Sequence, residues 1–178
     1  ALIGFTLNNS QNTPKLFVVA PTVDQNHDSK PTGLAAILQV RKAQYIDVAT
    51  TRDANLFTDV TLKTYAEVVF LSTTGDVLND EQQTAFEQYI RSGGGFVGVH
   101  AATDTEYDWP WYNQLVGAYF KSHPKQQEAV LHIVDHSHLS TKHLPAEWKR
   151  KDEWYNFKSI QPNLHILITI DEKSYTGG

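Results

Sequence analysis

The residue best suited to chemistry in this sequence is His100, which directly follows a short apolar run. Phe96, Val97 and Val99 predict a buried strand, and the glycines at 93–95 let the chain enter it sharply. Ligands bind at the carboxyl ends of the strands in parallel α/β sheets, so we expect His100 to face a crevice. An imidazole there can act as a base or a metal ligand, and its alternative role is to hydrogen-bond the turn.

The segment around His100 has the pattern of a nucleophile elbow, in which a strand leads through a tight turn into a helix. The reactive position holds histidine in place of serine or cysteine, which argues against a serine-hydrolase triad. Asp104 lies four residues further along the chain. Its carboxylate can either orient His100 or cap the next helix.

Two other loops are expected at the same edge of the sheet as His100. His27 and Asp28 follow the first predicted strand, and Asp76 follows the third. Because the carboxyl ends of parallel strands meet at one edge, we expect these side chains to line the crevice and bind substrate. Simple exposure to solvent is the alternative for His27.

An aromatic segment supplies further candidates. Trp109 and Trp111 can form a stacking platform for a sugar ring, or they can pack in the core. His123 precedes a proline that fixes a turn, which can bring the imidazole to the same pocket. Glu153 lies beside aromatic residues, where partial burial suits a general acid, and an ordinary exposed charge is the alternative.

Several histidines are candidates for metal binding. His27, His100 and His123 are the candidate ligands of a divalent metal whose identity stays open. His136 and His138 have a spacing compatible with zinc, and strand geometry would place them on one face. Since no known zinc motif contains them, exposure to solvent is favoured for this pair.

Apolar runs separated by turn residues organise the first hundred residues. They predict strands over residues 16–20, 45–49, 68–72 and 96–99, and helices over 31–42, over 58–65 and from Asn79 to Gly93. This βαβαβαβ order predicts an α/β fold with a parallel sheet and helices on both of its faces. Beyond Thr105 the pattern is irregular, and strands are predicted only over 129–134 and 165–170.

The composition excludes several classes of protein. A chain of 178 residues with 40% hydrophobic content fits one globular domain, assigned to residues 1–178. The net charge of −5 argues against a nucleic-acid partner, and no apolar run is long enough to span a membrane. The chain has no cysteine, which excludes a catalytic thiol and disulfides. The same absence slightly favours a periplasmic or secreted location over a cytoplasmic one.

The sequence resembles the ThuA-like (trehalose utilisation) family of the class I glutamine amidotransferase-like superfamily. The matching segments are residues 69–76, 93–104, 107–112, 115–124 and 152–157, with His27-Asp28-Ser29 in the first loop. The resemblance spans residues 16–178 and implies a flavodoxin-like three-layer sandwich with histidine in place of the catalytic cysteine. It excludes thioester glutaminase chemistry and implies a role in carbohydrate metabolism. The family continues beyond Gly178, so we expect the domain to be truncated at its C-terminal end.

These observations lead to one preferred function and two alternatives. The preferred function is a sugar-processing hydrolase or lyase that acts on a sugar or disaccharide derivative, with a carbohydrate as the partner and a homo-oligomer left open. The catalytic candidates are His100, Asp104 and Glu153. The binding candidates are His27, Asp28, Asp76, Trp109, Trp111 and His123. The alternatives are a non-catalytic sugar-binding or regulatory module and a metal-dependent hydrolase.

Overall fold

The computed structural model describes residues 13–20, 30–44 and 46–177. The chain forms two compact units, one within residues 1–102 and the other within residues 103–178. Each unit is described by itself below. The single domain and the C-terminal truncation expected from the sequence stay predictions. Among the described residues, no helix combines the length and the apolar character needed to cross a membrane.

The first unit alternates strands and helices. Its elements are β1 (Lys15–Val19), α1 (Lys30–Gln44), β2 (Asp47–Thr51), the 3-10 turn η1 (Ala54–Leu56), α2 (Asp59–Leu62), β3 (Glu67–Leu71), α3 (Asp80–Arg91) and β4 (Gly95–Val99). The strands lie in the order β2-β1-β3-β4, and every neighbouring pair is parallel. The predicted α/β fold with a parallel sheet is therefore confirmed.

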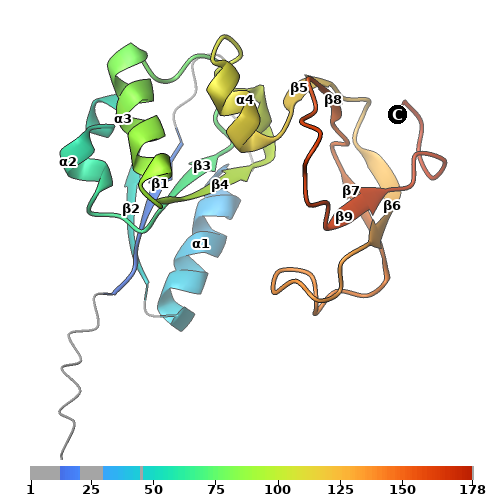
Figure 1. Ribbon diagram of the computed structural model, residues 1–178. Helices are drawn as coiled ribbons and strands as arrows, with labels where there is room; N and C mark the ends of the chain where they lie inside the picture. The colour runs from blue at the N-terminus through green and yellow to red at the C-terminus, as the bar shows by residue number, and fades with distance from the viewer. Residues whose placement is uncertain (1–12, 21–29, 45, 178) are drawn as a thin grey trace, which may run out of the picture. The chain divides into compact units, whose positions relative to one another are not determined.

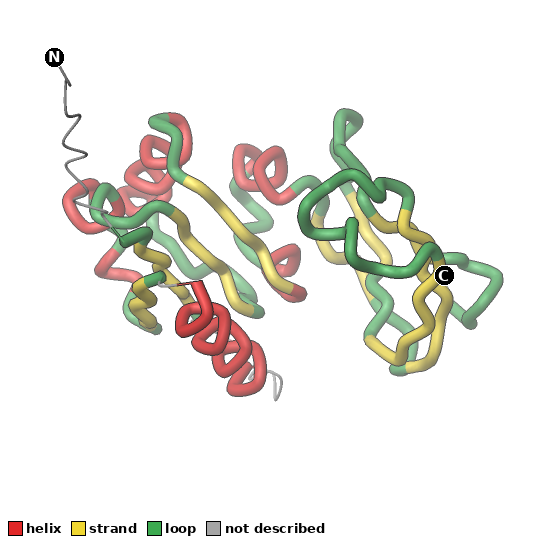
Figure 2. The backbone as a smooth tube through the Cα atoms, turned by 90° about the horizontal axis from the view of Figure 1, so that it is seen from below, coloured by secondary structure: helices red, strands yellow, loops and turns green. Residues whose placement is uncertain are grey.

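The sheet lies between α1 on one face and α2 with α3 on the other (Figure 1 and Figure 2). Val18, Val69 and Leu71 form the core on the α1 side, where Leu34 and Ile37 of that helix pack against them. Consecutive strand residues point to opposite faces. The neighbours of these residues therefore face the other helices. This two-sided burial explains why β1 and β3 read as continuous apolar runs.

Aromatic rings fill the core on the side of α2 and α3. The ring of Phe70 on β3 stacks on Phe86 of α3, with the two ring centroids 5.5 Å apart. Phe57 contacts both of these rings, and Phe96 of β4 packs edge-on against Phe70 at 5.4 Å. Offset and edge-to-face pairs of this kind stabilise a core beyond the area that they bury.

The start of α3 is fixed by a reciprocal pair of hydrogen bonds. The Asn79 side-chain oxygen accepts from the Gln82 backbone nitrogen at 3.0 Å, and the Gln82 side-chain oxygen accepts from the Asn79 backbone nitrogen at 2.9 Å. This capping box satisfies two donors that a helix N-terminus leaves open. Gly93 follows the helix with a φ of 101°, the left-handed conformation that glycine adopts without strain. Both ends predicted from the sequence are confirmed.

Replacing Asn79 with alanine is expected to lower the free energy of unfolding by about 1 kcal/mol, since the cap is lost while the helix interior is intact. Urea unfolding followed by circular dichroism measures the change. Gln88→Ala is the matched control, because Gln88 is an exposed position of the same helix with no part in the cap. An equal change in both variants would contradict the assigned role of Asn79.

The second unit is built from short antiparallel sheets. Its elements are α4 (Pro110–Val116), β5 (Tyr119–Ser122), β6 (Gln127–Ile133), β7 (Glu147–Asp152), β8 (Asn156–Lys158) and β9 (Ile168–Ile170). β5 pairs with β8, and β6 lies between β7 and β9. Ala129, Leu131 and Trp154 form the core, and the Trp154 indole donates to the Gln127 carbonyl oxygen at 2.8 Å.

The structure corrects the expectations for three segments. The predicted strand 45–49 begins at Asp47, and the predicted strand 165–170 is confined to Ile168–Ile170. The segment 135–156, for which no strand was predicted, contains β7. β7 has the sequence EWKRKD and alternates exposed with half-buried residues. Its half-buried side includes Arg150 and Asp152. Because these positions hold charged residues, the strand does not show the alternation of apolar and polar residues by which strands are recognised in a sequence.

Candidate functional site

The carboxyl edge of the parallel sheet brings the ends of β3 and β4 to the same level. Leu71 pairs with Val99, so Ser72 and His100 are the first residues to leave the two strands. The Ser72 backbone nitrogen donates to the Val99 carbonyl oxygen at 3.1 Å, which ties the two exits together. This is the edge at which α/β proteins bind their ligands.

Both exits have an unusual backbone conformation. His100 has a φ of 51° and Ser72 has a φ of 48°. The left-handed region costs a residue with a side chain roughly 1–2 kcal/mol, and strain of this kind concentrates at functional sites. The sharp turn predicted at His100 is thus confirmed, and the chain continues directly into the 3-10 segment η2 (His100–Asp104). The reactivity of the imidazole stays a prediction.

Close packing beneath the turn depends on Gly98. A Cβ atom at this position would lie 3.1 Å from the Ala102 Cβ. The absence of a side chain therefore allows η2 to fold back over the end of β4, which presents the half-buried His100 at the edge of the sheet.

The loop after β3 contributes polar side chains to the same edge. Thr73 and Thr74 are buried, whereas Asp76 is exposed. Within the described part of the chain, the Thr74 side-chain oxygen has no hydrogen-bond partner. A buried hydroxyl of this kind is ready to bind a polar group. Thr74 lies in the loop before Asp76 that was expected at this edge, whereas Ser72 was missed because it was assigned to the end of the predicted strand. His27 and Asp28 lie outside the described residues.

In the second unit, three predicted residues gather around Tyr155. The Tyr155 ring lies 5.8 Å from the His123 ring in a stacked arrangement and 4.4 Å from the Phe120 ring. Burial raises the pKa of Tyr155, and the negative charges of Glu153 and Asp104 raise it further. The phenol therefore stays protonated at neutral pH and lies among carboxylates as a hydrogen-bond donor.

Tyr107 connects Asp104 to this group. Its hydroxyl lies 2.5 Å from Asp104 Oδ1 and 2.9 Å from the Phe120 carbonyl oxygen. Burial raises the pKa of Tyr107, and the hydrogen bond to Asp104 acts in the same direction. The Lys158 ammonium lies 4.3 Å from the centre of the Tyr107 ring. Asp104, Tyr107, Phe120, His123, Glu153 and Tyr155 are called the tyrosine–carboxylate cluster below.

The tyrosine–carboxylate cluster contains residues that the sequence did not single out. Tyr107 and Tyr155 belong to the segments that carry the family resemblance, but aromatic residues are as frequent in cores as in sites. Glu153 is half-buried and accepts a hydrogen bond from the Gln126 side chain at 3.2 Å. The cluster can donate and accept protons or bind hydroxyl groups, while the catalytic roles of Asp104 and Glu153 stay predictions.

The two candidate tryptophans lie together at the start of α4. Their ring centroids are 4.9 Å apart, and both residues are half-buried. Trp109 also packs against Tyr112, which is fully buried. Each indole thus contributes to packing and retains some exposed surface. Both roles considered for the pair, packing and sugar stacking, remain open.

Glu106 is a buried carboxylate that sequence reasoning missed. It is 1% exposed and has a φ of 54°. The Tyr119 hydroxyl donates to its backbone oxygen at 2.6 Å. Burial and then the Glu106 charge raise the pKa of Tyr119 to about 12, and the same two causes raise the pKa of Tyr112. Glu106 escaped notice because it follows Thr105 outside any apolar pattern.

Alkaline pH is expected to unfold the second unit through its tyrosines. A phenol in the unfolded chain has a pKa near 10, whereas that of Tyr119 in the folded chain is about 12. Its contribution to stability is complete below pH 10. It is lost as the pH rises towards 12, because only the unfolded chain releases the proton. The loss amounts to about 1.4 kcal/mol per pH unit for each buried tyrosine.

Ultraviolet absorbance of tyrosinate during a pH titration, with circular dichroism recorded in parallel, measures this effect. We expect the late-titrating phenols to ionise together with the loss of secondary structure. Tyr119→Phe removes one of these phenols and is expected to reduce the loss of stability between pH 10 and pH 12. Ionisation of every tyrosine near pH 10 in a chain that stays folded would contradict the prediction.

His136 and His138, the pair considered for zinc, do not form part of a metal site among the described residues. His136 and His138 follow β6 in a turn, so the strand geometry expected for them is wrong. Asp135 holds this turn: its carboxylate accepts from Ser137 and lies 2.9 Å from the His165 ring nitrogen. These hydrogen bonds lower the pKa of Asp135 to about 2. In the parts of the chain that the structure covers, no three His, Asp or Glu residues are arranged to hold a metal ion.

Comparisons with known proteins agree with this architecture. The family model described as ThuA, trehalose utilisation, matches residues 15–178. The chain is similar to the crystal structure of a ThuA-like protein from Bacteroides uniformis, with a TM-score of 0.78 and 22% identity over 97% of this chain and 74% of that one. A ThuA-like protein from Parabacteroides merdae gives a TM-score of 0.76 and 24% identity over 91% and 70% of the two chains. No curated protein matches the sequence.

Proposed function

The chain belongs to the ThuA family of trehalose utilisation, and from this premise we propose that it binds and processes a sugar or disaccharide derivative. The proposed base is His100. The other proposed catalytic groups are the carboxylates of Asp104 and Glu153, and the proposed binding residues are His27, Asp28, Asp76, Trp109, Trp111 and His123.

The observation that carries the proposal is the backbone at the end of β4. His100 keeps an imidazole at a φ of 51°, where glycine or asparagine would be less strained. Backbone strain of this kind concentrates at functional sites, which supports a chemical role for the imidazole.

The proposed chemistry follows from the ionisation of the groups. A neutral imidazole accepts a proton at physiological pH, and a carboxylic acid can return one to a leaving group. Two reactions suit this pairing: removal of a proton beside a sugar carbonyl, and hydrolysis of a glycoside derivative. The exposed parts of the Trp109 and Trp111 rings suit the C–H face of a sugar.

A non-catalytic sugar-binding module is the second candidate. It is favoured by the side chain at the elbow, since histidine supplies neither the thiol nor the hydroxyl with which other elbow enzymes attack their substrates. The two candidates share a ligand and differ in turnover.

A thermal-shift screen of monosaccharides and disaccharides, including oxidised sugars, tests the proposal. A ligand at 100 times its Kd stabilises the folded protein by about 2.7 kcal/mol, which corresponds to a rise in Tm of about 5–10 °C for a chain of this size. Product analysis of every stabilising sugar then separates the enzyme from the binding module. If no sugar raises the Tm, both candidates are contradicted.

A further inference from the structure

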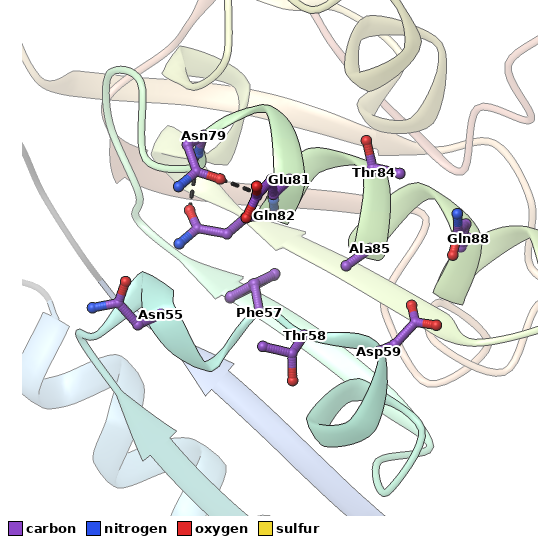
Figure 3. A pocket seen from close by; sticks show the side chains of 10 residues that line it. All are labelled: Asn55, Phe57, Thr58, Asp59, Asn79, Glu81, Gln82, Thr84, Ala85 and Gln88. Atoms are coloured by element: carbon purple, nitrogen blue, oxygen red, sulfur yellow. Dashed lines mark hydrogen bonds between the residues drawn. The ribbon is translucent and has the colours of Figure 1, made fainter.

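A pocket of about 410 Å³ lies beside α2 and α3 in the first unit, and its lining contains none of the candidate site residues named above. It is bounded by η1 and the start of α2 on one side and by the first turns of α3 on the other (Figure 3). Its volume falls within the range of small-molecule sites. We call it the α2–α3 groove.

The floor of the groove is apolar and its walls are polar. Phe57, which is 2% exposed, and Ala85 lie at the base. Asn55 and Asp59 stand on one wall, and Asn79, Gln82 and Gln88 on the other (Figure 3). A few convergent polar groups over an apolar base are the usual composition of a ligand site.

The capping box prepares two amide groups for a ligand. The side-chain oxygens of Asn79 and Gln82 are both occupied by backbone donors, which fixes the orientation of the two amides. Gln82 is 9% exposed and lines the groove. Neither amide nitrogen has a hydrogen-bond partner among the residues that the structure describes. Asn79 is exposed and Gln82 is mostly buried, and both amide groups face the solvent-accessible groove, so these N–H donors are available to a bound oxygen.

The charges of the groove select against anions. Its lining contains Asp59 and Glu81, and neither lysine, arginine nor histidine. The Asp59 carboxylate forms an ion pair with the Lys63 ammonium at 3.1 Å. Lys63 does not line the groove itself but lines an adjoining hollow of about 230 Å³. The amide donors of Asn79 and Gln82 on one wall and the Asp59 carboxylate on the other match hydroxyl groups, because each hydroxyl both donates and accepts.

We propose that the α2–α3 groove binds an uncharged polyhydroxyl molecule the size of a monosaccharide. The ligand accepts from the amide nitrogens of Asn79 and Gln82, donates to Asp59, and covers the apolar base. The adjoining hollow shares Asp59 and Gln88 with the groove and has room for part of a second ring. This site is separate from His100 and does not depend on the function proposed for that residue.

Titration of the isotope-labelled protein with D-glucose, followed by NMR, tests the proposal. We expect shifts of the Asn79 and Gln82 side-chain NH₂ signals and of backbone signals from residues 55–59 and 79–88. Glucose 6-phosphate is expected to bind at least 10-fold more weakly, because its charge meets two carboxylates. His100→Ala is expected to leave the affinity of this site for glucose unchanged.

Two variants examine the groove itself. Ala85→Phe fills its base and is expected to weaken glucose binding at least 10-fold. Asp59→Asn removes the carboxylate to which the ligand donates, so it provides a second test if the larger side chain disturbs folding. Glu87→Gln on the same helix lies outside the lining and is the matched control. The proposal is overturned if glucose causes no shifts, if the shifts survive both groove variants, or if the phosphate ester binds as tightly as glucose.

Discussion

Phe86→Ala lowers the free energy of unfolding by about 3–5 kcal/mol, the expected cost of removing a fully buried ring from a core. Phe86 is 0% exposed, and its ring centroid lies between 5.5 and 5.8 Å from those of Phe57, Phe70 and Phe96. The cavity that this change leaves is surrounded by the rings of Phe70 and Phe96 on the strands and of Phe57, which directly follows η1. Because these rings cannot move readily into the cavity, the stability falls by the lost transfer free energy and also by the lost van der Waals contacts.

Urea unfolding followed by circular dichroism gives the size of this effect. Val60→Ala is the matched control, since Val60 is 81% exposed on the neighbouring helix α2 and is expected to change the stability by less than about 0.5 kcal/mol. A loss below about 1 kcal/mol for Phe86→Ala would mean that α3 does not depend on the aromatic core.

The parallel sheet was predictable because its signals are local. Buried parallel strands read as apolar runs, and the helices between them begin and end at residues with capping chemistry. Asn79 and Gly93 mark the two ends of α3 in the sequence as they do in the structure. The general preference for short right-handed connections between parallel strands also limited the topologies that this order of elements could form.

The second unit was predicted less well because its signals depend on tertiary packing. β7 carries charges on both faces, and Trp148 is the single apolar residue of the strand that packs against the core. α4 has proline in its first turn and ends at Gly117 with a φ of 91°, both recognisable signals. They were overlooked because the dense aromatic residues around them suggested a site.

The residues of the candidate site show the same difference between local signals and tertiary packing. His100 was found because the glycines and the strand that precede it are adjacent in the chain. Ser72 reaches the same edge only through the register of β3 with β4, and no pattern in the sequence encodes that register. Glu106 is notable only because it is buried in the folded chain, and the pKa of Tyr155 is raised by burial and by the charges of neighbouring carboxylates.

Replacing His100 with alanine is expected to reduce turnover of the processed sugar at least 100-fold, the usual contribution of a general base, while sugar affinity stays within a few-fold. Alanine at a φ of 51° keeps the strain and removes the base. His100→Asn is the matched control for the backbone, since asparagine tolerates this conformation and cannot act as a base at neutral pH.

Steady-state kinetics and sugar binding of the three proteins separate chemistry from structure. If both variants lose turnover and bind sugar normally, the imidazole acts on the substrate, because the two replacements share only its absence. If asparagine restores turnover, the backbone at the end of β4 is what matters and His100 is not the base. A wild-type protein that binds sugar without converting it supports the binding module. In that case, a role of His100 in binding is tested by comparing the sugar affinity of the two variants with that of the wild type.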